Sequence, residues 1–279
     1  MKKTLTGMMF LFLTACSSSS NPVLDAVIGG MSVTQVEGYF DLDQKQEKEF
    51  EKEIKKDLQR IQQQQLQEFA QAIRKFDVRV PVEKTDSEIL SEVFDKLEGE
   101  YKKASGAFQN SAVHLVGMLR EEQFVHFEKQ VRTEIQKARA EGINPKNDEL
   151  LARYKKQIKY WVGPTTVHQN HLLQQFVIKE PFPWKERLDN REKMLNQFLS
   201  NRQDAKKMRQ FIAQFMTDYD SLRTTEYAEA MNGYEDRFKG FLNKFWTTLD
   251  YGQKQQLRVS LNKQAQEVER YVMNSHGVK

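Results

Sequence analysis

The residue with the clearest chemistry is Cys16, the only cysteine among the 279 residues of the chain. It follows a short apolar run, residues 5–13, which itself follows two lysines at the start of the chain. Small residues lead from this run to Ala15. This is the arrangement of a bacterial lipoprotein signal, which lipid-transfer and cleavage enzymes recognise. The run is far shorter than the roughly 20 residues that span a bilayer. We therefore predict that residues 1–15 are removed and that the Cys16 thiol carries lipid.

The residues after Cys16 predict where the modified chain would lie. Ser17 stands where an Asp would be the usual signal for retention in the inner membrane. Each buried methylene of an acyl chain contributes about 0.8 kcal/mol to membrane binding, so three acyl chains would anchor the protein stably. We expect a lipid-anchored protein, with palmitate among its acyl chains, on the periplasmic face of the outer membrane. Serines 17–20 begin a flexible tether predicted over residues 16–40.

The composition of the remaining chain favours helices and excludes several functions. Only 13 Gly and 6 Pro are present, 39% of the residues are hydrophobic and 29% are charged. Loss of Lys2 and Lys3 lowers the net charge from +4 to +2, and acids and bases alternate along the chain. Such alternation is typical of solvated helix faces, so we predict no nucleic-acid partner. With one cysteine, no intramolecular disulfide can form.

Apolar residues recur at helical spacing from residue 43 onward. From residue 43 to Phe76 they predict a first helix of about 34 residues, ended by the segment 77–81, where Pro81 disfavours helix in the residue before it. Later helices are predicted to stop at Gly142 and Gly163. The fold class is all-α: residues 41–279 form a multi-helix bundle with long amphipathic helices. The narrow stripe of the first helix leaves two alternatives, a homodimer seam or a neighbour within the chain.

A polar residue with Gln three places later recurs along the chain. This spacing predicts capping boxes, in which the first side chain accepts the N3 amide and the Gln side chain accepts the N-cap amide, stabilising each helix start by about 1 kcal/mol. A related segment, Leu119–Gln123, has Arg120 at the cap position. The predicted pairs are Asp43 with Gln46, Thr166 with Gln169, Ser200 with Gln203, and Asp250 with Gln253.

These helix starts resemble two groups of proteins. The Leu-x-x-x-Gln spacing resembles the LTxxQ-type periplasmic stress chaperones, small helical proteins that hold unfolding clients. Segments 39–46, 161–169 and 249–253 are similar to an uncharacterised family of envelope lipoproteins from Gram-negative bacteria, over nearly the whole mature chain. Members of that family tend to carry Trp-His-Arg on the first helix, whereas this chain has Arg60-Ile61-Gln62. The resemblance implies an envelope lipoprotein and no established activity.

No residue set predicts catalysis or metal binding. His168 and His171 are three residues apart, but no carboxylate completes a ligand set with them. Nucleophile elbows, His-Glu-x-x-His motifs and glycine-rich phosphate loops are absent from the sequence. We therefore predict no enzyme and no cofactor.

Two basic clusters leave alternatives open: solvated helix faces, or surfaces for anionic lipid headgroups or a client protein. We expect an adaptor that binds other envelope proteins, with a chaperone-like holdase for unfolded clients as the alternative. The clusters comprise Arg153, Lys155, Lys156 and Lys159, and Arg202, Lys206, Lys207 and Arg209.

Overall fold

The computed structural model of this chain describes residues 33–79, 99, 103 and 105–275. Every regular element in these ranges is a helix, and none of the described residues forms a strand, so the predicted all-α fold is confirmed. The predicted signal peptide, Cys16 and residues 16–32 of the predicted tether lie outside the described residues.

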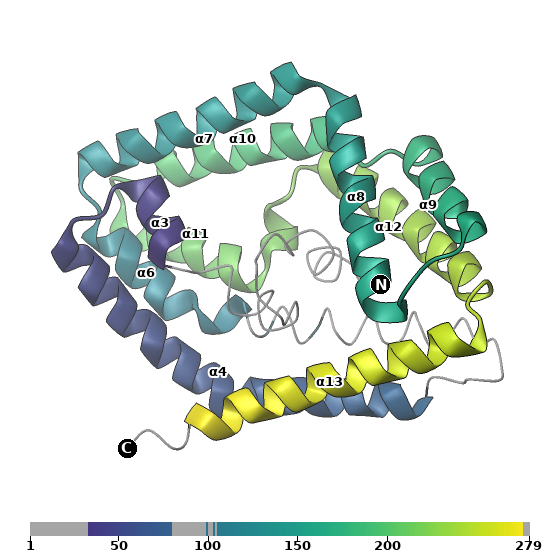
Figure 1. The fold of residues 1–279 in the computed structure, drawn as a ribbon. Helices are drawn as coiled ribbons and strands as arrows, with labels where there is room; N and C mark the ends of the chain where they lie inside the picture. Colours follow the sequence, from purple (N-terminus) through teal and green to yellow (C-terminus); the bar gives the residue numbers. More distant parts are fainter. Residues whose placement is uncertain (1–32, 80–98, 100–102, 104, 276–279) are drawn as a thin grey trace.

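The helices are numbered as in Figure 1. Their bounds are α3 Val33–Phe40, α4 Gln44–Arg79, α6 Gln109–Met118, α7 Glu121–Glu141, α8 Ile143–Val162, α9 Val167–Lys179, α10 Trp184–Ser200, α11 Ala205–Thr217, the 3-10 helix η2 Tyr219–Leu222, α12 Thr225–Trp246 and α13 Tyr251–Ser275.

The described helices form a closed circuit of packed neighbours. Helix α4 packs on α13, α13 on α8, α8 on α9, α9 on α12, α12 on α10, α10 on α7, α7 on α3, and α3 on α4. In Figure 1 this circuit is a frame with α7 and α10 along one side and α4 and α13 along the opposite side. Helices α6 and α11 join each other and α4 at one end of the frame.

Aromatic side chains fill the core where α8, α9 and α12 meet. Phe176 of α9 stacks on Phe241 of α12 with ring centroids 4.7 Å apart. Tyr154 of α8 stacks on Phe238 of α12 at 5.3 Å. A second cluster, built around Phe198 of α10, joins α7, α10 and α11. Since each aromatic ring buries about 150–250 Å², these clusters supply much of the apolar burial that holds the corners of the frame.

Two tyrosine hydroxyls meet inside the aromatic core. The hydroxyl oxygens of Tyr154 and Tyr234 are 2.8 Å apart, and both side chains are fully buried. Burial raises the pKa of Tyr154 well above its ordinary value, and the hydroxyl of Tyr234 contributes in the same direction. Both phenols therefore stay protonated, and each can serve the other as hydrogen-bond partner between α8 and α12.

Several predicted boundaries differ from the observed ones. Residues 33–40, assigned to the tether, form α3, and Phe40 stacks on Phe127 of α7 with centroids 4.5 Å apart. The break predicted from residue 77 begins too early, because α4 continues to Arg79. Pro145 lies in the first turn of α8, where a missing N–H costs no helical bond. Gly142 and Gly163 end their helices with positive φ, as predicted.

The tyrosine contact predicts a coupled pair of mutations. Tyr154→Phe or Tyr234→Phe alone should lower the free energy of unfolding by about 1 kcal/mol, because each leaves a buried hydroxyl without its neighbour. The double variant should lose little more than either single variant, so urea unfolding of all four proteins should give a coupling energy of about 1 kcal/mol. Strictly additive losses would show that the two hydroxyls do not interact.

Candidate functional site: two paired glutamine corners

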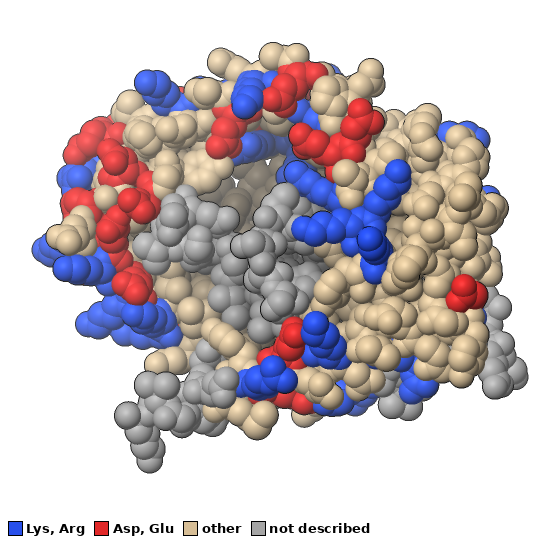
Figure 2. All heavy atoms as spheres, viewed as in Figure 1, with Lys and Arg blue, Asp and Glu red and all other residues tan. Residues whose placement is uncertain are grey.

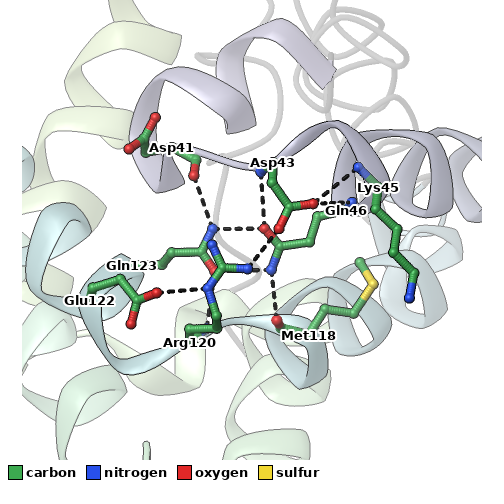
Figure 3. A network of polar contacts seen from close by, with 8 residues as sticks. All are labelled: Asp41, Asp43, Lys45, Gln46, Met118, Arg120, Glu122 and Gln123. Carbon is green, nitrogen blue, oxygen red and sulfur yellow. Dashed lines mark hydrogen bonds and ion pairs between the residues drawn. The ribbon is translucent and has the colours of Figure 1, made fainter.

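Gln46 and Gln123 form a reciprocal amide pair, which we call the first glutamine pair. The Nε2 of Gln46 donates to Oε1 of Gln123 at 2.9 Å, and the Nε2 of Gln123 donates to Oε1 of Gln46 at 2.8 Å. Figure 3 shows the two side chains pointing toward each other from the first turns of α4 and α7. The pair therefore joins two helix starts that are 77 residues apart in the sequence.

Each amide of the first pair also binds backbone groups at the starts of both helices, α4 and α7. Gln46 Oε1 accepts the N–H of Asp43 at 3.1 Å, and Gln123 Oε1 accepts the N–H of Arg120 at 3.0 Å. The second hydrogen of each Nε2 binds backbone just before the other helix. Gln46 donates to the carbonyl of Met118 at 2.7 Å, and Gln123 donates to the carbonyl of Asp41 at 3.0 Å. Each of these carbonyls lies two residues before the N-cap of the opposite helix.

Gln169 and Gln253, the second glutamine pair, repeat the same geometry between α9 and α13. Their amides exchange hydrogen bonds of 2.8 and 3.0 Å. Gln169 Nε2 also donates to the carbonyl of Thr248 at 2.9 Å, and Gln253 Nε2 donates to the carbonyl of Pro164 at 2.8 Å. These carbonyls again lie two residues before the opposite N-cap. The two pairs are thus equivalent constructions at two places in the frame.

The pairing satisfies every polar atom of the four amides. A Gln side chain has two N–H donors and two acceptor lone pairs, and each of these four glutamines uses all of them. All four side chains are buried, Gln169 with 1% of its surface exposed and Gln123 with 2%. An unsatisfied buried amide would cost about 1–3 kcal/mol, so the complete set of bonds is what allows these polar groups to lie inside the protein.

The N-cap residues complete three capping boxes of the predicted kind. Asp43 Oδ1 accepts the N–H of Gln46 at 3.0 Å, Thr166 Oγ1 accepts that of Gln169 at 3.2 Å, and Asp250 Oδ1 accepts that of Gln253 at 2.8 Å. At the start of α7, the N-cap residue Arg120 has no side-chain acceptor. The N–H of Gln123 donates instead to the Arg120 carbonyl at 3.0 Å.

Arg120 instead links the outside of the first pair. Its Nη1 donates to Oδ2 of Asp43 at 2.7 Å, and its Nε donates to Glu122 at 2.7 Å. The backbone N–H of Gln46 and then the guanidinium of Arg120 hold the pKa of Asp43 below its ordinary value. The Asp43 carboxylate is therefore ionised at neutral pH, and it caps α4 while also bridging to the start of α7.

The prediction for Ser200 and Gln203 is wrong. Ser200 is the last residue of α10, and its hydroxyl donates to the carbonyl of Gln197 at 2.8 Å. The N-cap of the following helix is Asp204, whose Oδ1 accepts the N–H groups of Lys206 and Lys207, each at 3.0 Å. A cap that Asp204 satisfies alone needs no glutamine, so the spacing at Ser200 was a coincidence in a Gln-rich chain.

The sequence did not predict the partner of each glutamine, nor a buried carboxylate. The spacing of the motif predicts a local hydrogen bond. It does not show that the amide N–H groups of each glutamine bind a second glutamine and a carbonyl next to another helix. The missed signal was burial: a Gln that faces the core needs more partners than its own cap supplies. Asp57, which is buried on α4, likewise bonds the N–H of Ser111 on α6 at 2.9 Å, and Arg60 of the noted tripeptide pairs with it.

The histidines noted in the sequence lie on the surface near the second glutamine pair. His168 and His171 are exposed on α9, next to the buried Gln169. Among the residues that the structure describes, no three His, Cys, Asp or Glu side chains gather as metal ligands. The described helices also include none that is long and apolar enough to cross a membrane.

In each basic cluster some residues pair with a carboxylate; in the α8 cluster Arg153 pairs with Glu149 at 3.7 Å. On α11 and the turn before it, Arg202 pairs with Glu121 at 3.2 Å and Lys207 pairs with Asp204 at 3.6 Å. On α8, Lys155, Lys156 and Lys159 are exposed and make no ion pair within the described ranges.

Comparison with known protein families gives one match. The Family of unknown function (DUF6279) matches residues 38–228. The chain belongs to this family. The matched region contains the first glutamine pair and Gln169, and it ends before Gln253. No curated protein and no solved structure matches the chain.

The glutamine pairs predict an unusually costly polar substitution. Gln253→Leu should lower the free energy of unfolding by about 2–4 kcal/mol, because it removes the bonds to Gln169, Pro164 and Asp250 and leaves buried polar atoms unsatisfied. Gln203→Leu is the matched control: this exposed residue should change stability by less than about 0.5 kcal/mol. Urea unfolding that gives equal losses for both variants would contradict the role of the pair.

The corrected cap predicts a second contrast. Asp204→Ala should cost about 1 kcal/mol of stability, since two N–H groups of α11 lose their acceptor, whereas Ser200→Ala should be close to neutral. Thermal unfolding of the two variants measures the difference. A larger loss of stability for Ser200→Ala than for Asp204→Ala would contradict the assignment of Asp204 as the N-cap of α11.

Proposed function

We propose that this protein is an envelope lipoprotein that acts as a protein-binding adaptor on the periplasmic face of the outer membrane. The observation that carries the proposal is the signal-like start of the chain, which ends at the single cysteine Cys16 and is followed by Ser17. This arrangement supports removal of a signal peptide, lipid attachment at Cys16 and placement of the folded body beside a membrane.

The construction of the body supports a binding role over a catalytic one. The best-formed polar sites within the described ranges are the two glutamine pairs, whose hydrogen-bonding groups are all occupied. Occupied amides bind no substrate and transfer no proton. They instead fix the angles between helices, which suits a rigid frame that presents its surfaces to other proteins.

A chaperone-like holdase is the second candidate function. Large apolar side chains are exposed on several helices, and such side chains can contact unfolded chains. Exposed examples include Val167, with 88% of its surface accessible, Tyr251 and Met273, each with 66%, and Ile178, with 62%. A holdase would bind many clients weakly, whereas an adaptor would bind one partner through a defined face.

Lipid attachment predicts a specific failure of processing. A Cys16→Ala precursor should keep its signal sequence, gain no acyl chains and leave the outer-membrane fraction, because no other thiol in the chain can accept lipid. Mass spectrometry of the purified protein and membrane fractionation measure both effects. Cys16→Ala protein with normal size and normal outer-membrane fractionation would overturn the proposed anchor.

Crosslinking in cells separates the two candidate functions. With wild-type protein, an adaptor should give one dominant crosslinked partner by mass spectrometry, and a holdase should give a broad set. Suppression of light scattering by a denatured client at stoichiometric ratio would support the holdase. A single partner without suppression would support the adaptor, and neither a partner nor suppression would contradict both.

A further inference from the structure

Helix α8 has one packed face and one open face. Its packed face includes Tyr154 and Ile158, which are buried against the shared core, and Tyr154 touches Tyr234 and Phe238 of α12. The lysines at positions 155, 156 and 159 are exposed on the other side of the helix. Helices α9 and α13 pack on α8, and α12 reaches it through Phe238 against Tyr154, so the exposed lysines lie away from these contacts.

Most of α8 and the whole of α9 lie in a stretch of the sequence without acidic residues. The thirty residues from Leu150 to Lys179 contain five Lys or Arg and no Asp or Glu. Within the described part of the chain, Lys155, Lys156 and Lys159 make no ion pair and no side-chain hydrogen bond. Elsewhere on the surface acids and bases alternate more closely along a helix, and some lysines pair, as Lys55 does with Glu51 at 2.7 Å. We call these three residues the α8 lysine face.

Figure 2 shows where this positive charge gathers. A group of blue side chains lies over α8, beside the hollow that opens under the side of the frame formed by α7 and α10. The atoms to the right of the group over α8 are mostly uncharged, whereas red and blue lie together over the opposite end of the frame. A local excess of positive charge that no ion pair within the described ranges offsets attracts an anionic partner.

We propose that the α8 lysine face is a docking surface for an extended, acidic segment of a partner protein. Lysines four residues apart on a helix are separated by about 6 Å along its axis. Alternate side chains of an extended chain are about 6.6–6.8 Å apart, so successive acidic side chains on one side of such a segment match the lysine spacing. The proposal deepens the adaptor function proposed above and rests on it.

The position of the lysines favours a chain segment over a membrane. A bilayer surface is nearly flat and contacts the protruding parts of a protein, whereas the group of blue side chains over α8 lies beside a hollow (Figure 2). A narrow extended segment can lie beside such a hollow. Lysine ammonium groups on flexible stems also suit a partner held by charge, whose binding is fast and sensitive to salt.

Fluorescence anisotropy with a labelled peptide of about ten residues, alternating Glu and Ser, tests the proposal on the full-length protein. Wild-type protein should bind at about 20 mM salt and lose most binding at about 300 mM, as charge screening requires. The triple variant Lys155→Gln, Lys156→Gln, Lys159→Gln should bind about tenfold more weakly or worse. Gln keeps helix propensity and removes only the charge, and circular dichroism of each variant verifies folding.

The matched control removes the same charge elsewhere. Lys45→Gln, Lys48→Gln, Lys52→Gln changes three lysines of α4, on a helix face where they alternate with glutamates, and should alter the affinity by less than about twofold. Equal losses in the two triple variants, or no binding by wild type, would overturn the proposal. Preferential binding of wild type to vesicles containing phosphatidylglycerol, over vesicles of phosphatidylcholine alone, without binding the peptide, would assign the face to a membrane and overturn it as well.

Crosslinking in cells keeps this inference separate from the adaptor function. Loss of the dominant partner in the α8 triple variant, and its retention in the α4 control, would support the lysine face. A partner that crosslinks equally to both variants would leave the adaptor function standing and overturn the lysine face. Absence of any partner with wild-type protein would instead contradict the adaptor function.

Discussion

The frame depends on two pairs of glutamine side chains, and the two amides of each pair hydrogen-bond to each other. Each glutamine caps its own helix, pairs with the other amide and donates its last hydrogen to the carbonyl before the opposite helix, as in Gln169 with Thr248. One residue therefore determines the start of one helix and its position against another. The frame follows from this double role, because each pair fixes a corner where four helices meet: α3, α4, α6 and α7 at the first, and α8, α9, α12 and α13 at the second.

Apolar packing and glutamine pairing stabilise these corners in different ways. The aromatic cluster of α8, α9 and α12 supplies burial that tolerates small shifts in register. The glutamine pairs tolerate no shift, since their bonds of 2.7–3.3 Å are lost if a helix slides by one residue. Specific register at the corners, together with general burial along the sides, explains how long helices with narrow apolar stripes form one defined frame. The stripe of α4 is covered by α13 and α6 within the same chain.

The sequence predicted those features that depend on local spacing. Helical periodicity gave the all-α class and the length of α4 to within two residues, and Gly142 and Gly163 marked two helix ends correctly. The caps at Asp43, Thr166 and Asp250 follow from side chains that reach their own backbone. The pairing of distant glutamines could not be predicted, because the spacing of one motif carries no information about which other motif it meets. Ser200 shows the converse, since the same spacing occurs where Asp204 caps the helix alone.

Hydrogen exchange at the N-cap amides tests the central claim most directly. The N–H groups of Thr166 and Asp250 donate to buried glutamine oxygens, at 2.9 and 3.3 Å, and should exchange as slowly as amides inside helices. Ala205, at the start of α11, lies at a helix start without a glutamine and should exchange fast. Exchange of Thr166 and Asp250 at the rate of Ala205, measured by NMR on the folded protein, would show that the glutamine pairs do not hold the corners.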